Sequence, residues 1–288
     1  MTVLLHHRDC LEWLSEQPQD SLHGVVTDPP YGIEYEQPED VHTTQGVWRV
    51  PPPNRKALPR FTELDGRDHA RIQEFFCALA QHLHRVVVPG AHVFIATNPL
   101  LSHLVYVPLL QAGFEKRGEV VRLVQTLRGG DRPKNAETEF PMVTVMPRSA
   151  WEPWGVFRKP CCGTVAENLR RYGTGALRRS SEERPFTDVI SSGVTPRAER
   201  VIAPHPSLKP QAFLRDLVRA ALPLETGTVL DPFAGSGSTL AAAEALGLDC
   251  VGTEKDPVFF GMALQAIPQL AAICTDHQIS DWSAFFSV

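Results

Sequence analysis

Long apolar runs are missing from this 288-residue chain, and none approaches the roughly 20 residues needed to cross a bilayer. The first residues reach an acid at Asp9, too early for the apolar core of a secretion signal. Cysteine is scarce, with six residues and no C-x-x-C spacing, and the 11 histidines form no H-x-x-H or H-E-x-x-H pattern. These absences argue against a disulfide framework and against a zinc site. We therefore expect a cytoplasmic protein without a metal and without a membrane anchor.

Positive charge is also in short supply. The chain has 28 Lys and Arg against 33 Asp and Glu, a net charge of −5, which argues against a protein coated in basic surface. The charge is uneven, because residues 148–200 hold ten Lys or Arg and six Asp or Glu, a local excess of four positive charges. One basic face toward a polyanion would account for this asymmetry, although runs of charge are more often solvated surface.

What the chain does have is a repeated alternation of apolar strands and amphipathic helices, typical of a mostly parallel sheet covered on both faces. Expected strands lie at residues 3–6, 24–27, 91–96, 119–124, 141–146, 227–230 and 250–253, and expected helices at 72–83, 100–112, 212–221, 240–246 and 258–267. Two segments interrupt the pattern: a loop at 37–59, which we expect to be mobile, and an irregular stretch rich in Arg, Gly and Ser at 151–192. The sequence predicts an α/β fold with a Rossmann-like, doubly wound sheet.

The strongest C-terminal motif is Val229-Leu-Asp-Pro-Phe-Ala-Gly-Ser-Gly-Ser-Thr239, in which an apolar strand ends in an acid and a glycine-containing turn opens a helix. Glycines there let the backbone approach a nucleotide-like ligand beyond the carboxyl end of the strand. The next strand ends at Glu254, whose carboxylate could accept hydrogen bonds from both ribose hydroxyls. A dinucleotide is the rival ligand, but its fingerprint needs a third glycine where this chain has Leu240. The motif therefore favours a ligand that needs no pyrophosphate cradle.

The strongest N-terminal motif is Asp28-Pro29-Pro30-Tyr31 at the end of an expected strand. A carboxylate and a backbone carbonyl can accept the two N–H bonds of an exocyclic base amine, whose lone pair is otherwise delocalised into the ring. The two prolines fix the turn and direct the Pro29 carbonyl. Tyr31 can stack on a base flipped out of a duplex. A strand that merely ends at a tight turn is the alternative interpretation.

In this order the motifs resemble those of the amino-methylating DNA methyltransferases, specifically the permuted group in which the catalytic motif precedes the cofactor motif. The segment 28–31 resembles the catalytic D/S-P-P-Y/F/W of that group, and Phe233-Ala-Gly-Ser-Gly237 resembles its F-x-G-x-G. His205-Pro-Ser-Leu-Lys-Pro210 resembles its H-P-x-x-K-P segment. Asp9-Cys10 resembles its G-D-C segment, with Arg8 in the place of the glycine. The resemblance covers about residues 3–36 and 186–270.

The resemblance implies a class I methyltransferase fold, S-adenosyl-L-methionine as cofactor, and methylation of a flipped-out base in double-stranded DNA. The implied catalytic residues are Asp28, Pro29, Pro30 and Tyr31. The expected cofactor-binding residues are Asp9, Cys10, His205, Lys209, Asp231, Phe233, Ala234, Gly235, Ser236, Gly237, Thr239 and Glu254. Residues 1–150 and 193–288 would form the catalytic and cofactor-binding halves of one domain, with a target-recognition region at 151–192 between them.

Contacts with DNA are expected from that recognition region, aided by the loop at 37–59. The candidates for phosphate or guanine contacts are Arg158, Lys159, Arg170, Arg171, Arg178 and Arg179. For each of these taken singly, a solvated surface position is the better interpretation. The sequence identifies neither the DNA site nor a partner nuclease, and it leaves both a monomer and a homodimer open.

Adenine N6 is the favoured target atom, because related enzymes that act on cytosine N4 more often carry serine at position 28. Cytosine N4 stays open on the same scaffold. An RNA or protein substrate is disfavoured because such enzymes usually carry asparagine there, and a silent DNA-binding module is disfavoured because Asp28, Tyr31, Gly235 and Gly237 are intact. Cys161 follows a proline, as the nucleophile of cytosine-C5 methyltransferases does, but it lies in the irregular stretch and we interpret it as structural.

Overall fold

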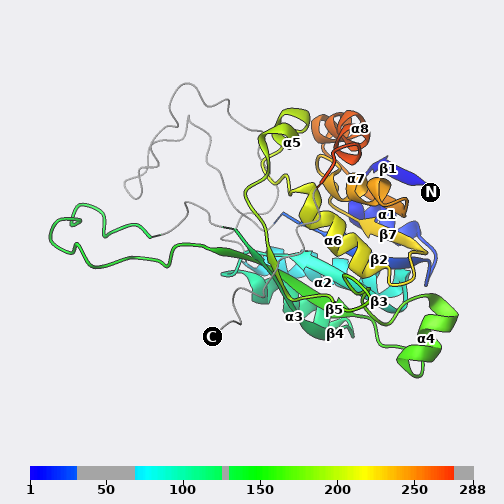
Figure 1. Ribbon diagram of the computed structural model, residues 1–288. Helices are drawn as coiled ribbons and strands as arrows, with labels where there is room; N and C mark the ends of the chain where they lie inside the picture. Colours follow the sequence, from blue (N-terminus) through cyan, green and yellow to red (C-terminus); the bar gives the residue numbers. More distant parts are fainter. Residues whose placement is uncertain (31–68, 125–129, 276–288) are drawn as a thin grey trace.

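The computed structural model describes residues 1–30, 69–124 and 130–275, which form an α/β fold around one sheet (Figure 1). The described strands are β1 (Val3–His7), β2 (Leu22–Thr27), β3 (Val87–Ala96), β4 (Glu115–Leu123), β5 (Trp151–Arg158), β6 (Val189–Ser191), β7 (Thr228–Asp231) and β8 (Asp249–Glu254). The described helices are α1 (Cys10–Glu16), α2 (His69–Val86), α3 (Ser102–Gln111), α4 (Val165–Tyr172), α5 (Arg197–Ile202), α6 (Gln211–Ala221), α7 (Ser238–Ala245) and α8 (Pro257–Ala271).

The order of strands in the sheet is β1-β8-β7-β2-β3-β5-β4-β6. The first five strands of this order run parallel to one another, whereas β5 is antiparallel to both β3 and β4, and β6 is parallel to β4. All strands except β5 therefore end at the same edge of the sheet, which we call the carboxyl edge; the opposite one is the amino edge. In open α/β sheets, ligands bind outside the carboxyl ends of the strands. The chain after Thr27, after Asp231 and after Glu254 meets at this edge.

Helices cover both faces of the sheet, and each face has its own apolar core (Figure 1). On one face, α1, α2 and α3 pack through residues such as Trp13, Phe76 and Leu109. On the other face, α6, α7 and α8 pack through residues such as Phe213 and Ile267. The doubly wound sheet with helices on both faces confirms the predicted fold class.

One expected strand is wrong. Residues 141–146 form turns and bends, no strand of the described sheet pairs with them, and the side chains of Met142 and Val145 are 94% and 64% exposed. Apolar residues make a strand only when a neighbouring strand and a packed face receive them. The loop expected at 37–59 lies outside the described residues, and so does Tyr31.

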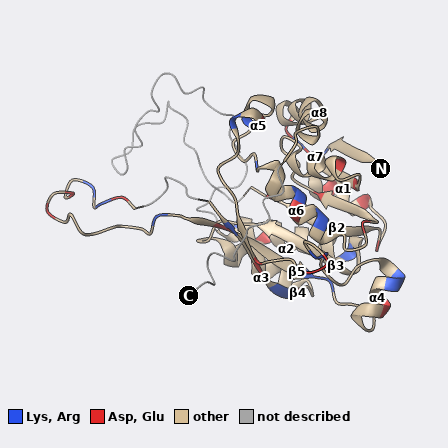
Figure 2. Ribbon diagram, viewed as in Figure 1, with Lys and Arg blue, Asp and Glu red and all other residues tan. Residues whose placement is uncertain are grey.

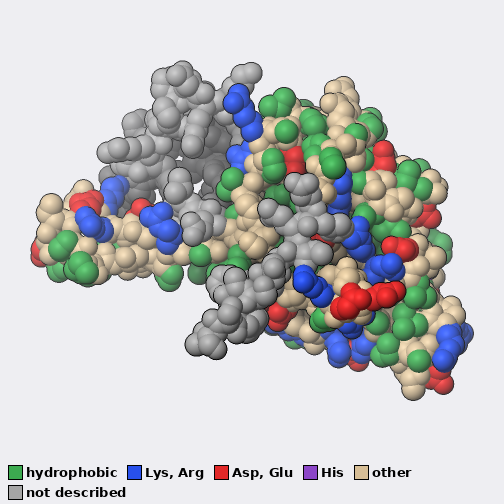
Figure 3. All heavy atoms as spheres, viewed as in Figure 1, with side chains coloured by type: hydrophobic (Ala, Val, Ile, Leu, Met, Phe, Trp, Pro, Cys, Tyr) green, Lys and Arg blue, Asp and Glu red, His purple; other side chains and the backbone are tan. Residues whose placement is uncertain are grey.

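Residues 130–150, which we call the arm, project from the carboxyl edge between the end of β4 and the start of β5 (Figure 1). Backbone hydrogen bonds close the base of the arm, from Gly130 N to Met146 O at 3.0 Å and from Val145 N to Asp131 O at 2.9 Å. Figure 3 shows hydrophobic and basic side chains side by side along it. The exposed hydrophobic and basic side chains of the arm are Phe140, Met142, Val143, Val145, Met146, Arg132, Lys134 and Arg148.

The stretch 151–192, expected to be irregular, contains β5, α4 and β6. β5 lies inside the sheet, where Trp154 is fully buried. α4 packs near the start of β3, because the buried Asn168 side chain donates to Pro89 O at 2.9 Å and to Thr174 O at 2.8 Å. The hydrogen bonds of Asn168 therefore hold α4 at the amino edge.

None of the helices in the described ranges is long and apolar enough to span a membrane.

A buried hydrogen bond joins the ends of β2 and β7. Thr27 Oγ1 donates to Asp231 Oδ1 at 2.7 Å, and Phe233 N donates to the same oxygen at 3.1 Å. Thr27 and Asp231 are 0% and 3% exposed. Burial raises the pKa of Asp231 from 3.8 to about 6, although hydrogen bonds from Thr239, Thr27 and Phe233 oppose the rise. The carboxylate that joins the two strands is therefore costly to ionise.

We expect Asp231→Asn to stabilise the protein at pH 8, because the amide keeps an oxygen acceptor and cannot ionise. A folded-state pKa above the unfolded value of about 3.9 gives stability that is fully present below pH 4 and is lost as the pH rises through 6. The variant should therefore exceed the wild type by up to about 3 kcal/mol at pH 8, and the difference should vanish near pH 4. Urea denaturation at both pH values measures this, with Asp188→Asn at an exposed position as the control. A variant that is less stable than the wild type by the same amount at both pH values would contradict the role of ionisation.

Candidate active site

The chain leaves β2 at Asp28, at the carboxyl edge. Val25 and Val26 are fully buried, and they fix the strand on which Asp28 depends. Pro29 is buried and Pro30 is partly buried; since neither has an N–H, the ladder of β2 cannot continue through them. Asp28 directly follows Thr27, so the Thr27–Asp231 bond brings it beside the loop that follows β7. Of the four expected catalytic residues, the structure describes these three.

The loop between β7 and α7 contains Phe233, Ala234, Gly235, Ser236 and Gly237. Backbone hydrogen bonds shape it, from Ala234 N to Thr253 O at 2.9 Å and from Gly237 N to Ala234 O at 2.7 Å. Gly235 and Gly237 have φ values of 53° and 80°, in the left-handed region that favours glycine. The backbone can thus bend sharply at the carboxyl edge and start α7 beside a ligand.

Both glycines also face close neighbours. A Cβ on Gly235 would lie 3.0 Å from the His205 ring, and a Cβ on Gly237 would lie 2.4 Å from Ile267 of α8. Ser236 and Thr239 are buried polar residues at the start of α7. The structure therefore brings the expected cofactor residues 233–239 into one turn that has room for backbone and none for added side chains.

Glu254 ends β8 with its carboxylate next to that turn. Its Oε2 accepts a hydrogen bond from Gly235 N at 2.8 Å, and its Oε1 accepts one from Asp256 N at 2.8 Å. Burial raises the pKa of Glu254, which these two bonds partly offset. Each carboxylate oxygen has two acceptor sites, so both can also receive a ligand hydroxyl. These acceptors fit the two hydroxyls of a ribose.

Asp9 and Cys10 lie at the same edge, because the last residue of β1, His7, pairs with Glu254. Asp9 caps α1: its Oδ1 accepts from Leu11 N at 2.8 Å. Burial raises the pKa of the Cys10 thiol to about 12, so it stays protonated at neutral pH. The described contacts thus place Asp9 and Cys10 beside the Glu254 end of the site.

The segment from His205 to Pro210 lies between the two motifs. His205 packs edge-on against Phe259 with ring centroids 4.4 Å apart, and Ser207 N donates to its Nδ1 at 3.2 Å. Burial, with a contribution from Lys209, lowers the pKa of His205 to about 3, so the ring is neutral. Against Gly235, the neutral ring forms one wall of the turn.

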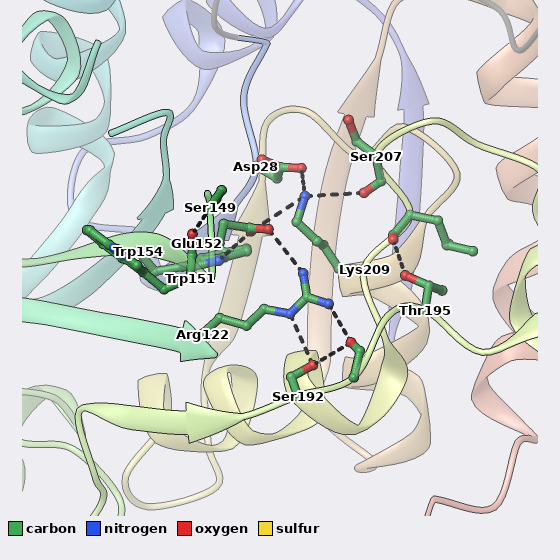
Figure 4. Close-up of polar contacts among 12 residues, drawn as sticks. Asp28, Arg122, Ser149, Trp151, Glu152, Trp154, Ser192, Thr195, Ser207 and Lys209 are labelled. Atoms are coloured by element: carbon green, nitrogen blue, oxygen red, sulfur yellow. Dashed lines mark hydrogen bonds and ion pairs between the residues drawn. The ribbon is translucent and has the colours of Figure 1, made fainter. Parts of the chain in front are cut away.

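Lys209 forms an ion pair with Asp28 Oδ2 (Figure 4). Its Nζ also lies 3.7 Å from Glu152 Oε1 and donates to Ser207 O at 3.4 Å. Glu152 in turn pairs with the buried Arg122, with Nη1 and Oε2 3.0 Å apart. The residue expected to serve the cofactor thus contacts the expected catalytic carboxylate.

Sequence reasoning missed Arg122 and Glu152. A signal for Arg122 existed, because it stands between Val120 and Val124 at an inward position of an expected strand, where a charge is unusual. Glu152 had no such signal, because its strand was not expected.

The six basic residues expected to contact DNA lie elsewhere, toward the amino edge. Arg158 pairs with Glu115, and Lys159 pairs with Asp20 just before β2. Arg178 pairs with Glu225, just before β7. Arg170 and Arg171 are on the outer surface of α4, and Arg179 lies nearby and donates to Ser181 O and Glu182 O. Figure 2 shows the basic residues of α4 and those of the arm at opposite ends of the sheet, so the structure does not bring this set to Asp28.

Two groups that can bind different ligands lie side by side at the carboxyl edge. A carboxylate after β2 can accept N–H bonds, and a bent glycine turn with an acid at the end of β8 can hold an adenosine. Over residues 1–30, 69–124 and 130–275, no cluster of three or more His, Cys, Asp or Glu could hold a metal ion. Cys161 lies near Gly175 in the packing around α4, away from Asp28.

Curated relatives cover nearly the whole chain. The Type II methyltransferase M.HindIII of Haemophilus influenzae is 24% identical, over 93% of this chain and 96% of that protein. The Type II methyltransferase M2.DpnII of Streptococcus pneumoniae is 22% identical, over 91% of this chain and 88% of that protein.

Solved structures share the fold. A Thermus thermophilus protein described as a DNA modification methylase, complexed with S-adenosyl-L-methionine, superposes with a TM-score of 0.60 at 20% identity, covering 94% of this chain and 95% of that one. The cytosine-N4-specific PvuII DNA methyltransferase superposes with a TM-score of 0.58 at 14% identity, covering 98% and 89%. Residues 22–265 match the N6/N4 family described as DNA methylase. Because that match spans most of the chain, the protein belongs to this DNA methylase family.

Proposed function

We propose that this protein uses S-adenosyl-L-methionine to methylate the exocyclic N6 of adenine in DNA. The observation that carries the proposal is the hydrogen bond between Thr27 and Asp231, which sets the Asp28 carboxylate beside the glycine turn. Membership of the N6/N4 DNA methylase family supports the reaction class. The Thermus thermophilus structure, complexed with S-adenosyl-L-methionine, supports the cofactor, and the Glu254 carboxylate beside Gly235 offers acceptors for the hydroxyls of its ribose.

When bound, S-adenosylmethionine supplies a methyl group on a sulfonium sulfur, and its transfer to nitrogen leaves the sulfur–carbon electron pair on sulfur. Asp28 accepts an N–H bond from the base amine and so keeps the nitrogen lone pair out of the ring. The same carboxylate can take the proton that the methylated nitrogen loses. Because this is direct transfer, the residues act by positioning and by stabilising developing positive charge. The protonated Cys10 thiol is not needed as a nucleophile.

Adenine is proposed over cytosine because position 28 is aspartate, where enzymes acting on cytosine N4 more often have serine. The solved neighbours include the cytosine-N4-specific PvuII enzyme, so the fold by itself serves either base. Two relatives are named Type II methyltransferases, which supports a role in site-specific DNA modification.

The DNA should approach the carboxyl edge, because the target base must reach Asp28. β2, which ends just before Asp28, has six residues, so roughly 20 Å separates Asp28 from the amino edge. The arm, which projects from the carboxyl edge, carries the exposed basic residues Arg132, Lys134 and Arg148. The arm also carries Asp131, Glu137 and Glu139, so its contacts would depend on individual side chains rather than on net charge. We therefore favour the arm over the amino-edge arginines as part of the DNA-binding surface.

We expect the wild type to form N6-methyladenine and Asp28→Ala to lose at least about a hundredfold of this activity. The turn proposed to bind the cofactor is formed by a different segment, residues 233–239. Affinity for S-adenosylmethionine should therefore change by less than about threefold in Asp28→Ala. Nucleoside mass spectrometry of methylated DNA and calorimetric titration measure the two effects. Asp188→Asn, at the amino end of β6, is the control with normal activity. N4-methylcytosine as the product would overturn the choice of base, and methyl transfer to RNA or protein alone would overturn the DNA substrate.

A second expectation concerns where DNA binds. Replacing Arg132, Lys134 and Arg148 with alanine should weaken DNA binding. The slope of log affinity against log salt concentration should become less negative by about 0.9 for each lost phosphate contact. Replacing Arg170 and Arg171 should leave the salt slope unchanged, because α4 lies at the amino edge. Binding isotherms between roughly 50 and 200 mM salt compare the two variants directly. If the α4 variant flattens the slope and the arm variant does not, the duplex binds where the sequence first suggested.

A further inference from the structure

Four charged side chains alternate in sign in the interior beside the site, as Figure 4 shows: Asp28, Lys209, Glu152 and Arg122. They come from four separate segments, namely the end of β2, the loop before α6, β5 and β4. Lys209 and Arg122 are 8% and 4% exposed. A buried charge is tolerated only when partners replace its lost hydration. These groups therefore depend on one another for their charged states.

Glu152 is held rigidly within this cluster. Trp154 Nε1 donates to its Oε1 at 2.9 Å, and Arg122 Nη1 donates to its Oε2 at 3.0 Å. Burial pushes the pKa of Glu152 up, but Lys209 and Arg122 outweigh burial and lower it, so Glu152 stays ionised. An ionised carboxylate fixed by two donors is a firm support for the Lys209 ammonium.

Arg122 is fixed as well. Its Nε donates to Ser192 Oγ at 3.1 Å and its Nη2 donates to Gly193 O at 3.0 Å. Its guanidinium also lies over the Phe213 ring, 5.3 Å from the centroid. Each guanidinium nitrogen thus has an acceptor, and the cluster is tied into the sheet and into α6.

Lys209 has three N–H bonds and three acceptors around it: Asp28 Oδ2, Glu152 Oε1 and Ser207 O. Burial pushes the pKa of Lys209 down, but Asp28 and Glu152 outweigh burial and raise it, so the amine stays protonated. Thr195 Oγ1 donates to Leu208 O at 2.6 Å and holds the backbone next to the lysine. The ammonium is therefore a fixed positive charge against the oxygen of Asp28.

We propose that Lys209 is a positioning residue for the base-binding carboxylate: it keeps Asp28 ionised and fixes its rotation, and Glu152 holds Lys209 in place. This inference rests on the proposed role of Asp28 toward the base amine. Replacing a buried ion pair by well-packed hydrophobic residues of similar volume is often neutral or stabilising. The charges are thus better explained by the chemistry at Asp28 than by stability.

The proposal also accounts for what happens as the base arrives. The amine N–H competes with the ammonium for Asp28, and Glu152 and the Ser207 carbonyl can then take more of the Lys209 hydrogen bonding. Lys209 needs to move little, because Glu152 Oε1 is already 3.7 Å away. The Lys209 ammonium can therefore free part of the Asp28 carboxylate for the base amine. It still keeps Glu152 and the Ser207 carbonyl as acceptors.

The test compares Lys209→Met, Lys209→Arg and Glu152→Gln in steady-state kinetics on DNA. We expect Lys209→Met to lower kcat about a hundredfold while the dissociation constant of S-adenosylmethionine changes less than about threefold. Lys209→Arg should recover most of the loss, because it restores the charge. Glu152→Gln should give a smaller loss in the same direction. Lys116→Met, at an exposed position on β4, is the matched control with unchanged kcat.

The decisive readout is the pH profile, which a purely structural role would not move. Lys209→Met removes the positive charge that favours the ionised form of Asp28. The acid limb of kcat/KM should therefore move up by about one to three pH units in this variant. The charged or titratable groups around the pair are Glu152, Arg122, Asp231 and His205. Asp231, with a pKa of about 6, could add to that limb, so the profile is also measured in an Asp231→Asn background.

Three outcomes separate the ideas. Loss of S-adenosylmethionine binding in proportion to kcat would overturn the proposal and return Lys209 to the cofactor site that its motif suggested. An acid limb that does not move in Lys209→Met would overturn it as well, whatever the value of kcat. A wild type that binds the cofactor and methylates no DNA would refute the proposed function itself. Urea denaturation of each variant tests whether a loss of kcat comes from loss of folding.

Discussion

The site depends first on the parallel pairing of β2 with β7. Register pairs Gly24 with Val229 and Val25 with Leu230, which brings Thr27 and Asp231 close together at the carboxyl edge. Their buried hydrogen bond then sets the spacing between the segment that begins at Asp28 and the turn that begins at Phe233. Because both segments start from the ends of neighbouring strands, little else is needed to hold the two together. A shift by one residue in this register would separate them and would turn every side chain of β2 to the other face.

Electrostatics is the second constraint on the same edge. Three acids, Asp28, Asp231 and Glu254, follow or end three adjacent strands, and the fold answers each in a different way. Asp28 receives the ammonium of Lys209, Glu254 receives two backbone N–H groups, and Asp231 receives neutral hydrogen-bond donors and has its pKa raised to about 6. The acid with a full counter-charge is the one that the proposed chemistry requires to be ionised. Asp231 serves to join strands, a task that its protonated form can perform equally well.

Much of this could be predicted from the sequence, for a physical reason. Motifs at strand ends are local, and in a parallel sheet strand ends gather at one edge, so Asp28, the glycine turn and Glu254 could be brought together without coordinates. The direction of β5 could not be predicted. Because β5 runs antiparallel, its last residue, Arg158, leaves at the amino edge, and the basic residues that follow go with it. A count of charges along the chain carries no information on direction, so it could predict that the arginine-rich stretch contacts DNA but not at which edge of the sheet that stretch lies.

The partners of Lys209 illustrate a different limit. Glu152 and Arg122 belong to strands at the antiparallel side of the sheet, and they reach Lys209 only through packing across β5 and β4. No local pattern links residue 122 to residue 209, and the only trace in the sequence is a charge at an inward strand position.

The same geometry explains why the proposed catalytic motif can precede the proposed cofactor motif in the chain. β1, from the first residues, pairs with β8, and β7 lies between β8 and β2, so the two halves of the chain interleave in one sheet. Interstrand hydrogen bonds do not depend on which strand was made first, provided that direction and register are kept. The entropy of closing the long connection grows only as the logarithm of its length, so about 200 intervening residues add little cost over a short link. The order of motifs is therefore free to vary, whereas the identity of the residue at each strand end is not.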